Sequence, residues 1–246
     1  MAGSPFKLRP MEMRDYDAAE RVMAEAFVDS IMPMLFPTGK TEADREHGMP
    51  LYAKHMKDPN TSIRRMLVID SSVPPRPEDL VNLTAADRTA AESEGRIVGI
   101  AYWNFWPKDR TDEELAAEKA ADHAEGQPPS ADPAFCEAFF GAIDESKKEV
   151  LGGRAHILLH ILATDPQYHR RGVGAMQLKW GLDEADRLGI PAYLEASEYG
   201  APLYQRWGFE PLRYLGLHEK WYGGEKHLDP LLMLRPAKAR SSEVAT

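Results

Sequence analysis

A short run of small and cationic residues past the middle of the chain has the composition of a phosphate-binding loop. It reads His-Arg-Arg-Gly-Val-Gly-Ala and occupies residues 169–175. Glycines let a ligand approach the backbone, and a helix that begins here presents free N–H groups and the positive end of its dipole to an anion. His169, Arg170 and Arg171 add donors and charge. Spacing alone leaves two interpretations open, a phosphate cradle and an ordinary strand-to-helix turn.

The elements that must position this loop are a strand before it and a helix after it. An almost unbroken apolar run over 157–162 predicts the strand, which Pro166 closes. An amphipathic pattern follows the loop and predicts a helix that Gly189 and Pro191 terminate. Other glycine motifs fit poorly, because the Gly-Lys-Ser/Thr of a nucleotide P-loop and the third glycine of a dinucleotide fingerprint are both missing.

The loop resembles the Gln/Arg-x-x-Gly-x-Gly/Ala pyrophosphate loop of the GNAT superfamily of acyl-CoA-dependent N-acetyltransferases, and the preceding strand and proline match as well. A second signature follows in the expected order. Leu-Tyr-Gln-Arg-Trp-Gly-Phe-Glu at 203–210 resembles the family's apolar residue, tyrosine, variable positions and Gly-Phe. The resemblance covers residues 96–235 best. His169 stands where the family usually has Gln or Arg, but the backbone contacts of the loop do not depend on that side chain.

The resemblance implies an α/β fold and a cofactor. The fold is a mixed, mostly antiparallel central sheet, splayed at the cofactor cleft and flanked by helices. The cofactor is acetyl-CoA, with coenzyme A as product, and its pantetheine lies between the splayed strands. The residues assigned to it are Leu162, Ala163 and Thr164 for pantetheine, His169, Arg170, Arg171, Gly172, Val173, Gly174 and Ala175 in the pyrophosphate loop, and Ser197, Leu203 and Tyr204 further along.

Tyr204 matches the tyrosine that the family uses as general acid toward the departing thiolate. A phenol carries its proton at neutral pH, and the developing thiolate is basic enough to take it. The alternative is a core tyrosine with a hydrogen-bond partner.

The base that accepts the proton of the amine has three candidates. His160 shares a strand face with Leu162, and His-Ile-Leu-Ala-Thr at 160–164 resembles the strand of serotonin N-acetyltransferase in which a histidine stands in the proton path. Imidazole titrates near neutral pH. His156, further along that face, and Glu195, on the next predicted strand, are the others. His160 can equally be a satisfied, half-buried side chain.

Metal and thiol chemistry are disfavoured. Four residues of strand separate His156 from His160 by about 13 Å, too far to share one metal ion. Cys136 lies among apolar and acidic neighbours that do nothing to lower the pKa of its thiol, so it is a poor nucleophile.

The remaining patterns predict one acetyltransferase domain over 1–236 and a flexible tail at 237–246. The further predicted strands are 6–11, 64–69, 95–106, 192–196, a strand from 209 and 231–234, and the further predicted helices begin or lie at 15–28, 42–57, 111–125, 132–150 and 202–206.

Three segments have an unusual composition. The helical insertion at 107–150 contains twelve acidic residues against five basic ones, which forms either a solvated helix face or a field that attracts a cationic amine. Residues 29–40 are apolar and broken by two prolines, so they either pack on the core or line an acceptor pocket. Residues 71–95 are proline-rich with few large apolar groups, which predicts a mobile surface excursion between two strands of a hairpin.

Charge and cysteine content exclude several classes of protein. The net charge of -9 and the pI near 5.4 argue against a nucleic-acid partner. The single cysteine excludes an internal disulfide and suits a reducing compartment. No early apolar run resembles a signal peptide, and no apolar stretch is long enough to cross a membrane. We therefore expect a cytoplasmic protein without a membrane partner, and a homodimer is compatible with the sequence.

These patterns predict an enzyme, an acetyl-CoA-dependent N-acetyltransferase. It would move an acetyl group to the primary amine of a small molecule by direct attack of the amine on the thioester. The alternative is a catalytically idle acyl-CoA-binding or sensor protein with the same fold, and Tyr204 and His160 argue against it. A bulkier acyl group is a third interpretation.

Overall fold

The computed structural model describes residues 4–58 and 62–238. Within them a seven-stranded sheet has the order β1-β2-β3-β4-β5-β7-β6, in which β4 and β5 are parallel and β1–β2, β5–β7 and β6–β7 are antiparallel. The strands are β1 (Phe6–Pro10), β2 (Ile63–Asp70), β3 (Arg96–Trp106), β4 (His156–Thr164), β5 (Ala192–Ala196), β6 (Glu210–Tyr214) and β7 (Leu231–Arg235). The predicted mixed, mostly antiparallel sheet flanked by helices is confirmed.

The helices follow the predicted order, with additions. They are α1 (Tyr16–Ala26), α2 (Met32–Leu35), α3 (Glu42–Lys57), α4 (Ala85–Glu94), α5 (Asp112–Glu125), α6 (Pro133–Leu151), α7 (Val173–Leu188), α8 (Ala201–Arg206) and α9 (His218–Trp221), with short 3-10 turns at Met13–Asp15, Pro77–Leu80, Pro166–Tyr168 and Lys226–Leu228. None of the described helices is long and apolar enough to cross a membrane. The predicted tail lies, from residue 239 onward, outside the described residues.

The chain divides into two compact units. Unit 1 consists of Met1–Trp103, Glu125–Glu137 and His160–Lys179, and unit 2 of Asn104–Ala124, Ala138–Leu159 and Trp180–Thr246. The predicted glycine loop therefore belongs to unit 1, and the Tyr-Gly-Phe signature belongs to unit 2.

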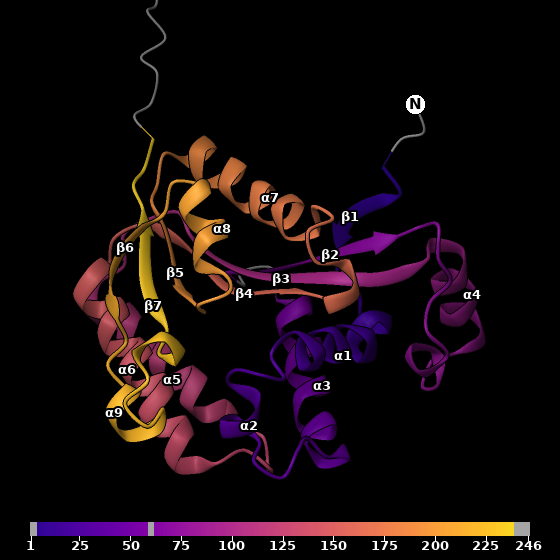
Figure 1. The fold of residues 1–246 in the computed structure, drawn as a ribbon, viewed down its shortest axis with the longest axis horizontal. Coiled ribbons are helices and arrows are strands. Elements are labelled where there is room, and N and C mark those ends of the chain that lie inside the picture. The colour runs from indigo at the N-terminus through magenta and orange to yellow at the C-terminus, as the bar shows by residue number, and fades with distance from the viewer. Residues whose placement is uncertain (1–3, 59–61, 239–246) are drawn as a thin grey trace, which may run out of the picture. The chain divides into compact units, whose positions relative to one another are not determined.

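In unit 1 the two faces of the strands bury different side chains. Leu67 and Ile69 of β2 pack with apolar residues of α1 and α3, whereas Val68 of β2 packs with Val98 of β3 and Val173 of α7. Consecutive residues of a strand point to opposite faces. As a result α1 and α3 cover one face of these strands and the start of α7 covers the other (Figure 1).

Unit 2 contains β5, β6 and β7 and most of the acidic insertion, of which residues 125–137 belong to unit 1. Leu194 of β5 and Met233 of β7 are buried. At the end of β7, Arg235 donates to both carboxylate oxygens of Asp186 on α7, at 2.7 and 3.0 Å. The insertion forms α5 and α6, which confirms its predicted helices, and Phe139 of α6 is buried.

The proline-rich segment at 71–95 contains a helix, α4, that was not predicted from the sequence. Thr84 accepts a hydrogen bond from the backbone N–H of Asp87 at 3.2 Å and so caps α4, and several alanines favour helix. None of the residues of α4 is buried. The apolar periodicity that indicates most helices is therefore missing from its sequence.

The apolar segment at 29–40 packs within unit 1. It contains α2, its Phe36 is buried, and the backbone carbonyl of Leu35 accepts a hydrogen bond from the N–H of Asp132 at 2.9 Å. These contacts support the packing interpretation, and the acceptor-pocket interpretation stays a prediction.

A buried ion cluster anchors the turn that leads into the glycine loop. Asp165, directly after β4, is fully buried. Its Oδ1 accepts a hydrogen bond from the N–H of Gln167 at 2.9 Å, and its Oδ2 accepts one from Arg76 Nη2 at 2.7 Å. Arg21 Nη1 of α1 lies 3.8 Å from the same oxygen, and Arg21 also binds Asp79. The proline-rich segment is thereby tied to the turn.

Gly99 of β3 allows α7 to begin directly against the sheet. A Cβ at this position would lie 2.5 Å from Val173 Cγ1 and 3.1 Å from the side-chain amide of Gln177. We expect Gly99→Ala to lower the free energy of unfolding by about 1–3 kcal/mol, because the methyl group overpacks this contact. Chemical denaturation measures the change.

Gly141→Ala is the control for that variant. Gly141 lies in α6, where an added Cβ meets no described atom within 4 Å, and alanine is favoured over glycine in a helix by about 1 kcal/mol. A similar loss of stability in both variants would contradict the close-contact explanation.

Asp165→Ala should destabilise the protein by about 3–5 kcal/mol, because it leaves two partly buried guanidinium groups without their shared carboxylate. The matched control is Glu78→Ala, whose carboxylate is 58% exposed and lies 3.9 Å from Arg76. A surface pair of this kind contributes about 0–1 kcal/mol. Denaturation of the two variants should therefore differ clearly, and equal effects would argue against the anchoring role.

Candidate functional site

The glycine loop of unit 1 has the backbone geometry of an anion site. Arg170 has a φ of +61° and Gly172 a φ of +89°, both in the left-handed region. The helix α7 begins at Val173, and Met176 N–H donates to the carbonyl of Gly172 at 3.0 Å. The amides of the first residues of a helix have no partner within the helix. They are therefore available to an oxyanion at the positive end of the dipole.

The strained backbone at Arg170 supports a ligand site. It is the one non-glycine residue with a positive φ in the described part of the chain, and such a conformation costs about 1–3 kcal/mol. Residues held this way concentrate at ligand-binding loops. At Gly172 a Cβ would meet no described atom within 4 Å, so this face of the loop is open. The loop therefore fits the pyrophosphate group that was expected there.

The three cationic side chains of the loop differ in their surroundings. The Arg171 guanidinium lies 4.5 Å from the ring centre of Tyr168 and 3.8 Å from the buried carboxylate of Asp70. His169 Nε2 lies 3.3 Å from the carbonyl oxygen of Thr164. Arg170 is exposed and makes no ion pair with any described residue. Arg170 is therefore the side chain most available to a phosphate, which the sequence could not distinguish.

The predicted pantetheine residues end β4 and lie in unit 1 with the loop. Ala163 is buried, and Leu162 and Thr164 are half-buried. His160 is exposed although it lies within a strand of the central part of the sheet. An exposed imidazole at this point can exchange protons with solvent or substrate.

His156 has the surroundings of a satisfied core histidine. It is 2% exposed, its Nδ1 lies 2.7 Å from the carbonyl oxygen of Arg154, and its ring centre lies 4.8 Å from that of Trp106. Burial lowers the pKa of His156 to about 4. It is therefore neutral at physiological pH and poorly suited to act as a base there.

In unit 2, the side chain of Tyr204 is buried on α8. Its ring packs edge to face with that of Phe209 at 5.9 Å between ring centres, and no described residue forms a hydrogen bond with its hydroxyl. Burial raises the pKa of Tyr204 well above its usual value, so the phenol carries its proton at neutral pH. The alternative is a core tyrosine whose hydroxyl has a hydrogen-bond partner, and none of the described residues is such a partner.

Ser197 and Leu203 accompany Tyr204 in unit 2. Ser197 is exposed, and its backbone carbonyl accepts hydrogen bonds from the N–H groups of Gly200 and Ala201, both at 3.0 Å. Leu203 is half-buried on α8. Ser197 thus helps to start the helix that carries Tyr204, whatever contact it makes with a cofactor.

Glu195 of β5 has a carboxyl group that titrates near neutrality. Its Oε1 is buried and forms no hydrogen bond with a described residue. Burial raises the pKa of Glu195 to about 7, although the charge of Lys147 acts in the opposite direction. A carboxyl group with such a pKa is suited to general acid–base chemistry.

Sequence patterns did not identify the residues that anchor the turn before the glycine loop. Asp165 precedes Pro166, a pairing that often starts a turn and could have drawn attention to it. Arg76 carried no such signal, because its role depends on a contact with a residue far away in the chain.

Comparison with known proteins shows the family. The model of the acetyltransferase (GNAT) family matches residues 66–209. A curated relative, the probable acyltransferase SID5 of Ajellomyces capsulatus, is 42% identical over 43 residues, which are 18% of this chain and 32% of that protein. The matched part thus spans about a third of the relative's length.

Solved structures agree in fold. A mosquito arylalkylamine N-acetyltransferase like 5b has a TM-score of 0.56 at 15% identity, covering 94% of this chain and 99% of that one. The structure of histone acetyltransferase HPA2 and related acetyltransferase from Corynebacterium glutamicum has a TM-score of 0.55 at 18% sequence identity. This match covers 96% of this chain and 98% of that one. A Drosophila melanogaster polyamine N-acetyltransferase has a TM-score of 0.54 at 15% sequence identity, and the match covers 93% of this chain and 97% of that one. Because the family model matches more than half of the length of this chain, the chain belongs to the acetyltransferase (GNAT) family, a family of acyltransferases.

Proposed function

We propose that the protein is an acetyl-CoA-dependent N-acetyltransferase that acts on the primary amine of a small molecule by direct attack on the thioester. The observation that carries this proposal is the loop at 169–175, where a left-handed Arg170 and the open start of α7 lie within the family match. Bound acetyl-CoA supplies the acetyl group as an activated thioester.

The residues of unit 1 bind and orient the donor. The first amides of α7 and the guanidinium of Arg170 bind the pyrophosphate. The backbone at Leu162, Ala163 and Thr164 binds pantetheine, and one N–H of this strand polarises the thioester carbonyl. The resemblance to the family supports these assignments, as does the half-buried setting of the strand end.

Tyr204 gives its proton to the departing thiolate. Its raised pKa keeps the proton on the phenol at neutral pH, and the absence of a described hydrogen-bond partner leaves the hydroxyl available. Glu195 and His160 are the two groups that can accept the amine proton. Glu195 has a pKa near neutrality, and His160 is exposed.

A small amine is the acceptor that the comparisons favour. The Drosophila melanogaster neighbour forms N-acetylagmatine, and the mosquito neighbour is an arylalkylamine N-acetyltransferase like protein. The exposed, acidic α5 suits the attraction of a cation. The buried free thiol of Cys136 is compatible with a reducing compartment, so we place the protein in the cytoplasm.

Calorimetric titration with acetyl-CoA, followed by thiol release with a panel of amines, tests the function. We expect acetyl-CoA to bind in preference to ATP and NAD, and Tyr204→Phe to lower kcat by about 10²–10⁴-fold with unchanged acetyl-CoA affinity, because only the proton donor is lost. The control is Tyr199→Phe, at a residue that is 80% exposed. Binding without thiol release from any amine would favour the idle sensor, and no binding would refute both functions.

Glu195→Gln and His160→Gln identify the base. If Glu195 is the base, kcat/KM of the unaltered protein rises with pH through about 7, because the carboxylate must be ionised. This rise should be absent in Glu195→Gln. If the rise of kcat/KM with pH disappears only in His160→Gln, the general base is His160.

Stability provides an independent readout for Glu195. Its pKa is raised from 4.5 to about 7, so between these values the folded state holds a proton that the unfolded state releases. That contribution to stability is lost as pH rises through about 7. Glu195→Gln should therefore increase Tm relative to the unaltered protein more at pH 8 than at pH 5.

A further inference from the structure

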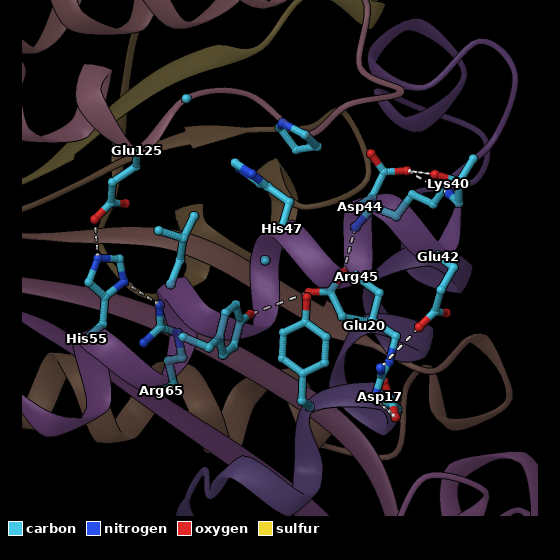
Figure 2. Close-up of a pocket in the computed structure, with 17 residues that line it drawn as sticks. Asp17, Glu20, Lys40, Glu42, Asp44, Arg45, His47, His55, Arg65 and Glu125 are labelled. Atoms are coloured by element: carbon cyan, nitrogen blue, oxygen red, sulfur yellow. Dashed lines mark hydrogen bonds and ion pairs between the residues drawn. The ribbon is translucent and has the colours of Figure 1, made fainter.

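Unit 1 contains a cavity of about 440 Å³, and none of the residues assigned to acetyl-CoA binding or proton transfer lines it. Its walls come from the first half of α1, from α3 and the two residues before it, from the beginning of β2, and from the end of α5 and the residues that follow it. Figure 2 shows Arg65, His55 and Glu125 along one side, across from Asp17 and Arg45. A cavity of this size suits a small organic ligand.

The acidic side chains of the cavity already have partners. These partners are Arg45 for Asp17 and Glu42, Lys40 for Glu20, Thr41 and Ser130 for Asp44, and Lys54 and His55 for Glu125. A cationic ligand would have to displace one of these contacts. The cavity is therefore not prepared for a cation, in spite of its several carboxylates.

Arg65 is the exception among the charged side chains that line the cavity. It forms no ion pair with a described carboxylate, and its buried Nε has no hydrogen-bond partner among the described residues. Its guanidinium lies 4.2 Å from the ring centre of Tyr52 and 5.1 Å from that of Tyr102. Contact with aromatic faces offsets part of the cost of burying a cation, but an anion is still missing.

His55 does not supply that anion. Its Nδ1 lies 3.4 Å from Arg65 Nη2, and its Nε2 lies 2.9 Å from Glu125 Oε1. Arginine can only donate, so Nδ1 accepts from Arg65 and Nε2 donates to Glu125. Lys54 balances the charge of Glu125 at 2.9 Å. Burial lowers the pKa of Arg65, against the opposite influence of Tyr52 and Glu125.

We propose that this cavity binds a small organic carboxylate, with Arg65 as its anchor. The planar guanidinium presents its donors in a fork that matches a carboxylate, and Arg65 is one of the residues that line the cavity. Tyr16, Leu51 and Tyr52 line the same cavity, and the rings of Tyr16 and Tyr52 pack edge to face at 4.8 Å. These side chains suit a ligand whose carboxylate is attached to an apolar or aromatic body.

The proposal does not rest on the acyl transfer. None of the lining residues belongs to the strand end or the glycine loop at 160–175. Ligand binding can therefore be measured on the full chain without acetyl-CoA, and a failure of either proposal leaves the other standing.

Calorimetric titration with benzoate, benzylamine and benzyl alcohol tests the site, because the three probes share a ring and differ in charge. Benzoate should bind with one molecule per chain, and the other two at least tenfold more weakly. Arg65→Met should weaken benzoate at least tenfold, which corresponds to about 1.4 kcal/mol. Arg65→Lys keeps the charge but loses the fork, so it should also weaken benzoate.

Arg64→Met is the matched control. Arg64 is the next residue of β2, points to the other face of the strand and is exposed, so its variant should bind benzoate like the unaltered protein. Since Arg65 lacks a carboxylate partner, Arg65→Met should leave Tm unchanged or raise it. A lower Tm with unchanged benzoate affinity would make Arg65 a structural cation and overturn the proposal. Tighter binding of benzylamine than of benzoate would overturn it as well.

Discussion

The buried carboxylate of Asp165 holds the start of the glycine loop in place. A charge with no access to water is tolerated only when cations and hydrogen-bond donors surround it. Arg76, Arg21 and the N–H of Gln167 meet that requirement. Any movement of the turn after β4 would separate these groups, so the cluster determines where the loop and the first amides of α7 lie.

This constraint gives the proline-rich segment a structural role. Its prolines restrict the backbone around Arg76, and α4 returns the chain to β3. Arg76 also binds Glu25 of α1, at 2.8 Å, so one guanidinium joins the segment to α1 and to the turn after β4. What resembles a dispensable surface excursion is thus part of the support of the glycine loop.

Outside this cluster, several polar groups lack the partners that buried polar groups usually have. The hydroxyl of Tyr204, the carboxyl of Glu195 and the guanidinium of Arg65 each lie in a desolvated setting without a full set of described partners. Such settings shift proton affinities or favour an external ligand. The well-paired cluster at Asp165 provides rigidity, and these under-paired groups are the ones to which we assign chemical roles in our proposals.

The sequence by itself determined the family, the glycine loop and most strands and helices, because these depend on residues close together in the chain. Local sequence patterns, such as apolar periodicity and turn and capping residues, located β2, β3, β4, α3, α5, α6 and α7 within a few residues. It did not reveal α4, whose residues are all outside the core. Only the tertiary structure decided that Arg170 is available while Arg171 is engaged and that His156 is neutral. It also decided that Glu195 titrates near 7 and that Arg65 has no carboxylate partner among the described residues. These properties depend on burial and on contacts between distant segments, which local residue patterns do not encode.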